Sequence, residues 1–129
     1  MTRFGLAIML IITLGSLVAL PVLAADPVIN RSVLTTDDGT TVVLLSVKAS
    51  GKAIYGINID DASASVDDII APKGWAGITS GDRVLFRTVD TPIQSGKTVV
   101  FRIITSNETG ELDVSFRDSR SYFGTKKTI

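Results

Sequence analysis

Residues 72–104 read PKGWAGITSGDRVLFRTVDTPIQSGKTVVFRII. This stretch contains two apolar runs, residues 83–88 and 98–104, and a connection between them that is rich in proline and glycine. It also carries Trp75, the only tryptophan of the chain. Two short apolar runs joined by a turn of this composition are typical of paired strands in a β-sheet core.

The same pattern continues on both sides of this stretch. Apolar residues alternate with polar or small ones at residues 55–60 and 112–117 as well as within the two apolar runs, and the period of two is that of a half-buried strand. The segment at residues 41–47 is the richest in β-branched residues. The expected inward-facing sets are Tyr55, Ile57 and Ile59; Val84 and Phe86; Val99, Phe101 and Ile103; and Leu112, Val114 and Phe116.

No segment after residue 25 has the period of an amphipathic helix. Turn residues recur about every 8–12 positions, as in all-β sandwiches. We therefore predict an antiparallel β-sandwich of about seven or eight strands, immunoglobulin-like in class. Residues 26–34 are expected to enter the first edge strand, residues 60–68 to be the least regular stretch, and residues 126–129 to form a loose tail.

The N-terminus has the pattern of a secretory signal. Arg3 is the only charged residue before Asp26, residues 4–20 are almost purely apolar, and small residues stand at Val22 and Ala24. This arrangement predicts a hydrophobic signal helix that is cleaved after Ala24. The domain organisation is then a signal peptide at residues 1–24 and one β-sandwich domain at residues 25–129, secreted or otherwise extracytoplasmic.

Two alternatives keep the apolar N-terminus. Residues 4–23 are long enough to cross a bilayer as an uncleaved anchor, although Gly15, Ser16 and Pro21 weaken such a span. A pilin-type leader cut near Gly5 would leave a hydrophobic tail for a filament, but the short basic leader and the acidic residue after the cut are missing.

Composition excludes several classes of function. The chain has no cysteine and no histidine, which removes the usual zinc sites, thiol nucleophiles and histidine-dependent triads. Lys and Arg together number 13, and so do Asp and Glu, so the sequence has no basic excess for nucleic acid. With no recognisable pair of nucleophile and base, we expect a protein that is not an enzyme and has no cofactor.

Three aromatic residues, Trp75, Tyr55 and Tyr122, are candidates for a platform that stacks on sugar rings. Such a platform requires flat rings exposed on one face. A single tryptophan in a small sandwich more often fills the core, because it buries a large apolar area. The partner expected from the sequence is an extracellular protein or a polysaccharide, and a membrane only if the N-terminal segment is retained.

Two acidic pairs, Asp60-Asp61 and Asp67-Asp68, are candidate ligands for a hard cation such as Ca²⁺. Their spacing matches no EF-hand, and solvated turns are the competing interpretation. Glycosylation sequons begin at Asn30 and at Asn107, and their use depends on the host.

Four arginines, Arg83, Arg87, Arg102 and Arg117, occupy outward positions of the expected strands. The simplest interpretation is charge that keeps the strand faces and edges soluble.

A set of anchors and turn residues resembles small exported sandwich modules of archaea and bacteria. It covers residues 40–125 and comprises Pro72-x-Gly74-Trp75, Gly81, Phe86, Pro92-Ile93-x-x-Gly96, Phe101-x-Ile103, Phe116-x-Asp118 and Gly124. These modules are similar to the immunoglobulin-like and cohesin-like sandwiches of cell surfaces. The resemblance implies a β-sandwich fold and an exported location, and it implies no catalytic residues. We expect a role in extracellular recognition or cell-surface structure.

Overall fold

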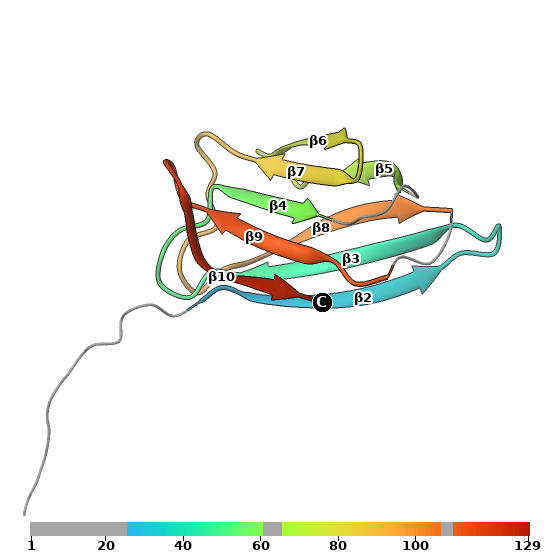
Figure 1. Cartoon of the computed structure of the whole chain (residues 1–129), viewed down its shortest axis with the longest axis horizontal. Helices are drawn as coiled ribbons and strands as arrows, with labels where there is room; N and C mark the ends of the chain where they lie inside the picture. Colours follow the sequence, from blue (N-terminus) through green and yellow to red (C-terminus); the bar gives the residue numbers. More distant parts are fainter. Residues whose placement is uncertain (1–25, 61–65, 107–109) are drawn as a thin grey trace, which may run out of the picture.

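A computed structural model describes residues 26–60, 66–106 and 110–129. Within these ranges the chain is all-β, with nine strands (Figure 1). The strands are β2 (Val28–Thr35), β3 (Thr41–Lys48), β4 (Gly56–Asp60), β5 (Val66–Ile70), β6 (Ala76–Ser80), β7 (Arg83–Arg87), β8 (Thr98–Thr105), β9 (Asp113–Arg117) and β10 (Tyr122–Thr128). The described part contains no helix able to cross a membrane, and residues 1–25, where the signal helix is predicted, lie outside it.

Two antiparallel sheets form the two layers seen in Figure 1. One sheet has five strands in the order β10-β9-β4-β7-β6, and the other has four in the order β2-β3-β8-β5. The chain crosses between the layers five times, at β3–β4, β4–β5, β5–β6, β7–β8 and β8–β9. The prediction of an antiparallel β-sandwich is therefore confirmed.

The core lies between the two inner faces and follows the period of two. In β3, Val43, Leu45 and Val47 are buried while the residues between them are half-buried. The rings of Phe86 on β7 and Phe101 on β8 lie 4.8 Å apart and so join the two sheets. Apart from Tyr55 and Val99, which are half-buried, every residue of the expected inward-facing sets is buried.

Three expectations differ from the structure. The strand β6 was not expected, because its sequence AGITS has no apolar alternation and all five residues are exposed. Asp67 and Asp68 lie on strand β5 rather than in an irregular loop. Residues 126–128 belong to β10, not to a loose tail, and Ile129 exchanges backbone hydrogen bonds of 2.9 and 2.8 Å with Leu112.

An ion pair and hydrogen bonds close one side of the sandwich, where the edge strands β2 and β10 meet. Lys127 Nζ forms an ion pair with Asp26 at 3.3 Å. The Arg31 guanidinium donates to the carbonyl of Gly110 at 2.7 Å and to that of Ile129 at 3.2 Å. These contacts hold β10 against the start of the domain and explain why the basic end of the chain is ordered.

The corner between β5 and β6 is fixed around Trp75. Its ring meets Phe101 edge-on, with centroids 5.0 Å apart, and its Nε1 donates to the carbonyl of Thr91 at 3.0 Å. Thr88 Oγ1 donates to the carbonyl of Gly74 at 2.8 Å. Gly74 has a φ of +85°, and a Cβ there would lie 2.6 Å from Thr91 Oγ1, so only glycine fits.

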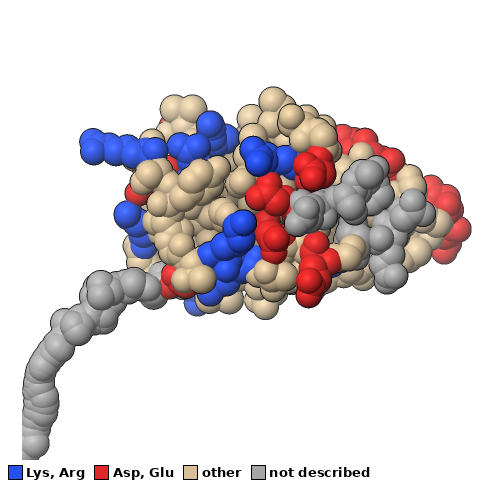
Figure 2. Space-filling view, viewed as in Figure 1, with Lys and Arg blue, Asp and Glu red and all other residues tan. Residues whose placement is uncertain are grey.

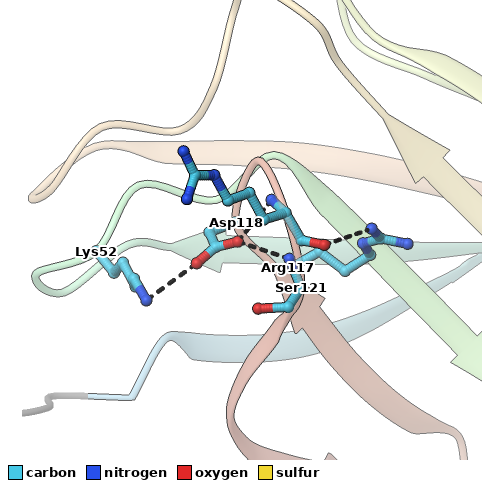
Figure 3. Close-up of polar contacts among 5 residues, drawn as sticks. Lys52, Arg117, Asp118 and Ser121 are labelled. Atoms are coloured by element: carbon cyan, nitrogen blue, oxygen red, sulfur yellow. Dashed lines mark hydrogen bonds and ion pairs between the residues drawn. The ribbon is translucent and has the colours of Figure 1, made fainter.

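The turn between β9 and β10 is organised by Asp118 (Figure 3). Its Oδ1 accepts hydrogen bonds from the backbone N–H groups of Arg120 at 2.7 Å and Ser121 at 2.8 Å. Its Oδ2 forms an ion pair with Lys52 at 3.0 Å. The backbone donors of Ser121 and Arg120, and then Lys52, hold the pKa of Asp118 far below its usual value.

Replacing Trp75 by Ala is expected to lower the free energy of unfolding by about 2–3 kcal/mol, less than for a fully buried ring because the side chain is only half-buried. Trp75→Phe keeps the contact with Phe101 and loses the N–H donor, which should cost about 1 kcal/mol. Urea denaturation measures both. The control is Val89→Ala, at a residue that is 91% exposed. Equal losses for Trp75→Ala and Val89→Ala would contradict the assigned role of the corner.

Replacing Asp118 by Ala should lower the melting temperature at pH 7. Because the pKa of Asp118 is depressed in the folded state, its contribution is fully present above about pH 4 and is lost as the pH falls below that value. The difference from the unmodified protein should therefore shrink between pH 4 and pH 2 in thermal melts. The control is Asp82→Asn, since Asp82 has no side-chain partner among the described residues. A deficit that stays constant with pH would argue against the Asp118 turn.

Candidate functional site

The outer face of the five-stranded sheet carries side chains in rows that cross the strands. The register places Tyr122 opposite Arg117, Arg117 opposite Gly56, Gly56 opposite Arg87 and Arg87 opposite Ala76. At the far end of the same strands, Asp60 lies opposite Asp113. Charge is therefore separated along the strands. In Figure 2, basic side chains gather toward the left, where β7 and β9 end, and acidic ones toward the middle and right.

Gly56 makes room for two arginines. A Cβ at this position would lie 3.3 Å from Arg87 Cδ and 3.4 Å from Arg117 Cβ. The aliphatic stems of the two arginines thus pack over the bare backbone of the central strand, one from each neighbouring strand. A side chain at this position would displace the arginine stems by a few tenths of an ångström, so the glycine matters here for space and not for a positive φ.

A cleft opens at this end of the sheet, where β4 begins and β7 and β9 end. Its volume is about 330 Å³. We call it the arginine cleft, and it is lined by Tyr55, Arg87, Thr88, Val89, Arg117, Asp118 and Ser119. Two backbone hydrogen bonds fix Tyr55 at its base, from Tyr55 N to the Arg117 carbonyl at 2.7 Å and from Thr88 N to the Tyr55 carbonyl at 3.0 Å.

The arginine cleft has positive charge without an acidic partner. Among the described residues, the Arg87 guanidinium makes no hydrogen bond or ion pair. The Arg117 guanidinium donates to the carbonyl of Arg120 at 3.3 Å and lies 5.1 Å from the centre of the Tyr122 ring. The only carboxylate of the cleft, Asp118, is already bound by Lys52 and the turn amides (Figure 3).

An apolar hollow adjoins the arginine cleft and shares Arg87 with it. The hollow has a volume of about 290 Å³, and we call it the apolar shelf. It is lined by Ala76, Gly77, Ile78, Leu85 and Arg87. Ile78 is 58% exposed, so the outer face offers apolar surface directly beside the cationic cleft.

The middle and the acidic end of this face are less open to a ligand. Asn58 lies between Leu85 and Ser115 in register and is 6% exposed, and its Oδ1 has no hydrogen-bond partner in the described structure. At the acidic end Arg83 Nε binds Asp60 at 3.0 Å, and Thr128 Oγ1 donates to Asp113 at 2.7 Å. Arg83 is thus neutralised, unlike Arg87.

The three aromatic candidates do not form one platform. Tyr55 lines the arginine cleft, and the 54% exposed Tyr122 lies against Arg117. Trp75 lies elsewhere, at the corner between the sheets, with its edge on Phe101 and its N–H bound to Thr91. The structure brings Tyr55 and Tyr122 to Arg117 and leaves Trp75 out. Their roles in binding remain predictions.

The acidic pairs are dispersed. Asp60 is on the five-stranded sheet, while Asp67 and Asp68 are on β5 of the other sheet. Asp67 accepts a hydrogen bond from Ser106, and Asp68 from the N–H of Ile69 at 2.8 Å. Asp61 lies outside the described residues, and among those described no three acidic residues gather as a cation site would require. A cation site remains an untested prediction.

The structure describes only one of the two glycosylation sequons. Asn30 is exposed on the edge strand β2, where a glycan would have space. Asn107 lies outside the described residues.

From the sequence, Arg87 and Arg117 are predicted only as surface charge, and no role is predicted for Gly56 or Val89. The two arginines are 30 positions apart and become neighbours only because β7 and β9 both pair with β4. The available signal was an outward arginine at the end of each strand, together with an outward glycine between tyrosine and isoleucine at residues 55–57.

Comparisons with known proteins extend the description of the fold. No family model matches the chain, and no curated protein matches it. An uncharacterised protein from Nocardia farcinica with an immunoglobulin-like fold aligns with a TM-score of 0.55 at 14% identity, covering 78% of this chain and 80% of that chain.

Two chitin-binding domains of known structure also align. The domain of a chitinase from Pyrococcus furiosus has a TM-score of 0.49 at 11% identity, covering 78% of this chain and 95% of that one. ChBD2 from Thermococcus kodakarensis has a TM-score of 0.44 at 20% identity, covering 67% and 86%. These similarities concern the fold. Together with the two antiparallel sheets, the match to the Nocardia protein shows that this chain has an immunoglobulin-like β-sandwich fold.

Proposed function

We propose that this protein is a non-catalytic binding module whose ligand is an acidic polysaccharide, held at the arginine cleft and extending over the apolar shelf. The observation that carries the proposal is the pair Arg87 and Arg117, which flank Gly56 in one open cleft and lack any carboxylate partner among the described residues.

The charge of the cleft favours an anion. A guanidinium donates to a carboxylate through two parallel N–H groups, and such bonds are about twice as strong as neutral ones. Asp118 does not compete for the arginines, because Lys52 and two backbone N–H groups already bind it. The cleft is therefore complementary to carboxylate or sulfate groups.

The chemistry of the face favours a polysaccharide over a peptide. Arg87 and Arg117 lie on the inner strands β7 and β9, whose backbone donors and acceptors are used in the ladders, so these two residues face a ligand with their side chains alone. A peptide laid across them would therefore form no β-ladder with β7 or β9. A sugar residue has hydroxyl groups and an apolar C–H face, which suit Tyr55, Val89 and the neighbouring apolar shelf.

A binding role without catalysis is supported by the carboxylates. Glycoside hydrolysis uses two carboxyl groups, one of them an acid with a raised pKa. The arginine cleft contains one carboxylate, Asp118, and its pKa is lowered by the turn that it organises. Such a group stays ionised and bound to its neighbours.

The location that goes with this function is extracytoplasmic, which rests on residues 1–24. Apolar residues followed by the small residues Val22 and Ala24 have the form of a cleaved signal. The alternative role, an anchored or filament subunit, requires the same residues to be retained.

Intact-mass analysis of the protein purified from its native host tests the location. The expected mass is that of residues 25–129. A mass that includes residues 1–24 would replace the secreted form by the anchored or filament form. It would leave the arginine cleft itself untested, so the binding experiment is done separately.

Binding is measured by affinity electrophoresis in gels that contain polygalacturonate, with neutral chitin or dextran as comparison polymers. Retardation is expected in polygalacturonate only. Arg87→Gln and Arg117→Gln should each weaken the apparent affinity by about tenfold, since each removes a charge-assisted hydrogen bond worth about 1.5–3 kcal/mol.

The matched control is Arg102→Gln, which removes the same charge from the outward side of β8 in the other sheet. Its affinity should be unchanged. If Arg102→Gln weakens binding as much as Arg87→Gln, the attraction is general and the cleft is not the site. Equal binding of chitin, unaffected by the arginine variants, would identify a neutral glycan and refute the acidic one.

A further inference from the structure

Strand β6 is an unprotected sheet edge. It pairs only with β7, and its other side has no partner in the described structure. Its residues Ala76–Ser80 are all exposed and include no charge, no proline and no bulge. Proteins usually protect such edges against pairing with another chain, by charged residues, prolines, bulges or a covering segment.

The other three edges of the sandwich are protected. The edges β2 and β10 are joined by the Asp26–Lys127 ion pair and by the hydrogen bonds of Arg31. The register of β10 is also broken between Phe123 and Lys127. Strand β5 carries Asp67 and Asp68 and has an irregular register there. Among the described edges, only β6 is left open.

The hairpin geometry decides which backbone groups of β6 are available. Ser80 and Arg83 close a two-residue turn, so they form a hydrogen-bonded pair, and bonded pairs then alternate along the ladder. Ile78 and Ala76 accordingly bond to β7. The N–H and C=O groups of Gly77 and Thr79 point outward, to the open side.

This edge is complementary to itself. Gly77 and Thr79 stand symmetrically on either side of Ile78, which is the centre of the strand. We propose that β6 pairs antiparallel with β6 of a second copy of this chain, about a two-fold axis at Ile78. Gly77 of each copy then exchanges both backbone hydrogen bonds with Thr79 of the other, and the two five-stranded sheets become one continuous sheet.

The side chains agree with this pairing. Ile78 of one copy meets Ile78 of the second copy in the closely spaced, non-hydrogen-bonded position, where side chains approach most. Each Ile78 is 58% exposed and lies beside Leu85 on the apolar shelf, so the contact extends an apolar row across both copies. Ala76 falls opposite Ser80 of the second copy, and no like charges are directly opposed.

The edge is also held in place before it pairs. A Cβ on Gly77 would lie 2.7 Å from Ile69 Cδ1 and 3.0 Å from Phe86 Cε1, so the strand backbone rests closely on the core. A rigid edge loses little conformational entropy on pairing. The contact is nevertheless short and buries less than a standard interface of about 1,600 Å², so we expect a weak dimer with a dissociation constant of about 10 µM to 1 mM.

Cysteine cross-linking tests the register. The chain has no cysteine, so a single substitution gives an unambiguous product. In Ile78→Cys the two Cα atoms of a dimer would be about 4.5 Å apart, within the range of a disulfide. In Ser80→Cys the two cysteines would be roughly 14 Å apart, which is too far. We expect rapid oxidation of Ile78→Cys to a disulfide dimer, at least tenfold faster than for Ser80→Cys.

Sedimentation equilibrium tests the dimer without cross-linking. The purified protein should shift from monomer to dimer as its concentration rises through about 10 µM to 1 mM. Ile78→Lys places two like charges on the axis and should weaken dimerisation at least tenfold. The control Val33→Lys adds the same charge at a 49% exposed position of edge β2 and should leave dimerisation unchanged.

Two results would overturn the proposal. One is a chain that stays monomeric throughout that concentration range, including the case in which an extended peptide binds to β6 instead. The other is equal cross-linking rates for Ile78→Cys and Ser80→Cys. Circular dichroism confirms that the variants fold, and the exposed position of Ile78 makes a folding defect unexpected.

Discussion

The contact between Phe86 and Phe101 is the interaction on which the rest of the structure depends. It joins the central part of one sheet to that of the other, and Trp75 adds its edge to Phe101 from the corner. Burying these rings requires the residues on either side of each to point outward, because side chains alternate along a strand. Arg87 is outward-facing because Phe86 is buried, and Arg117 because Phe116 is buried. The core therefore determines where the cationic groups of the outer face can be.

Sequence patterns predicted what depends on local alternation. The strands with buried, alternating residues were found, and the two-layer architecture followed from their number and spacing. Strand β6 could not be predicted from the sequence. It is held by its pairing with β7 and by the close contact of Gly77 with Ile69 and Phe86, and neither contact produces a periodic pattern in the sequence. The ordered C-terminal strand could not be predicted either, because Lys127 and Ile129 are held by Asp26 and Leu112, which are distant in sequence.

The candidate site was harder to predict for a related reason. Its two arginines are brought together by a third strand, and the glycine beneath them matters for its lack of a side chain. Pairing partners cannot be deduced from the local alternation of any one strand. The sequence indicates Trp75, Tyr55 and Tyr122 as candidate binding residues because aromatic side chains are few in this chain and large. In the structure the largest, Trp75, has its N–H bound to Thr91, while the smaller Tyr55 lines the cleft.

The separation of charge along the five-stranded sheet gives the molecule an electric dipole although its formal net charge is zero. A neutral body with such a dipole exerts a torque on a charged polymer but little net pull. At an ionic strength of about 0.10–0.15 M, screening limits this torque to separations below about 8–10 Å. Orientation would then be selected late, as a chain of negative groups turns toward Arg87 and Arg117 at the ends of β7 and β9 and away from Asp113. A polyanion would consequently make its first close contact at the arginine cleft, whichever of its own ends comes first.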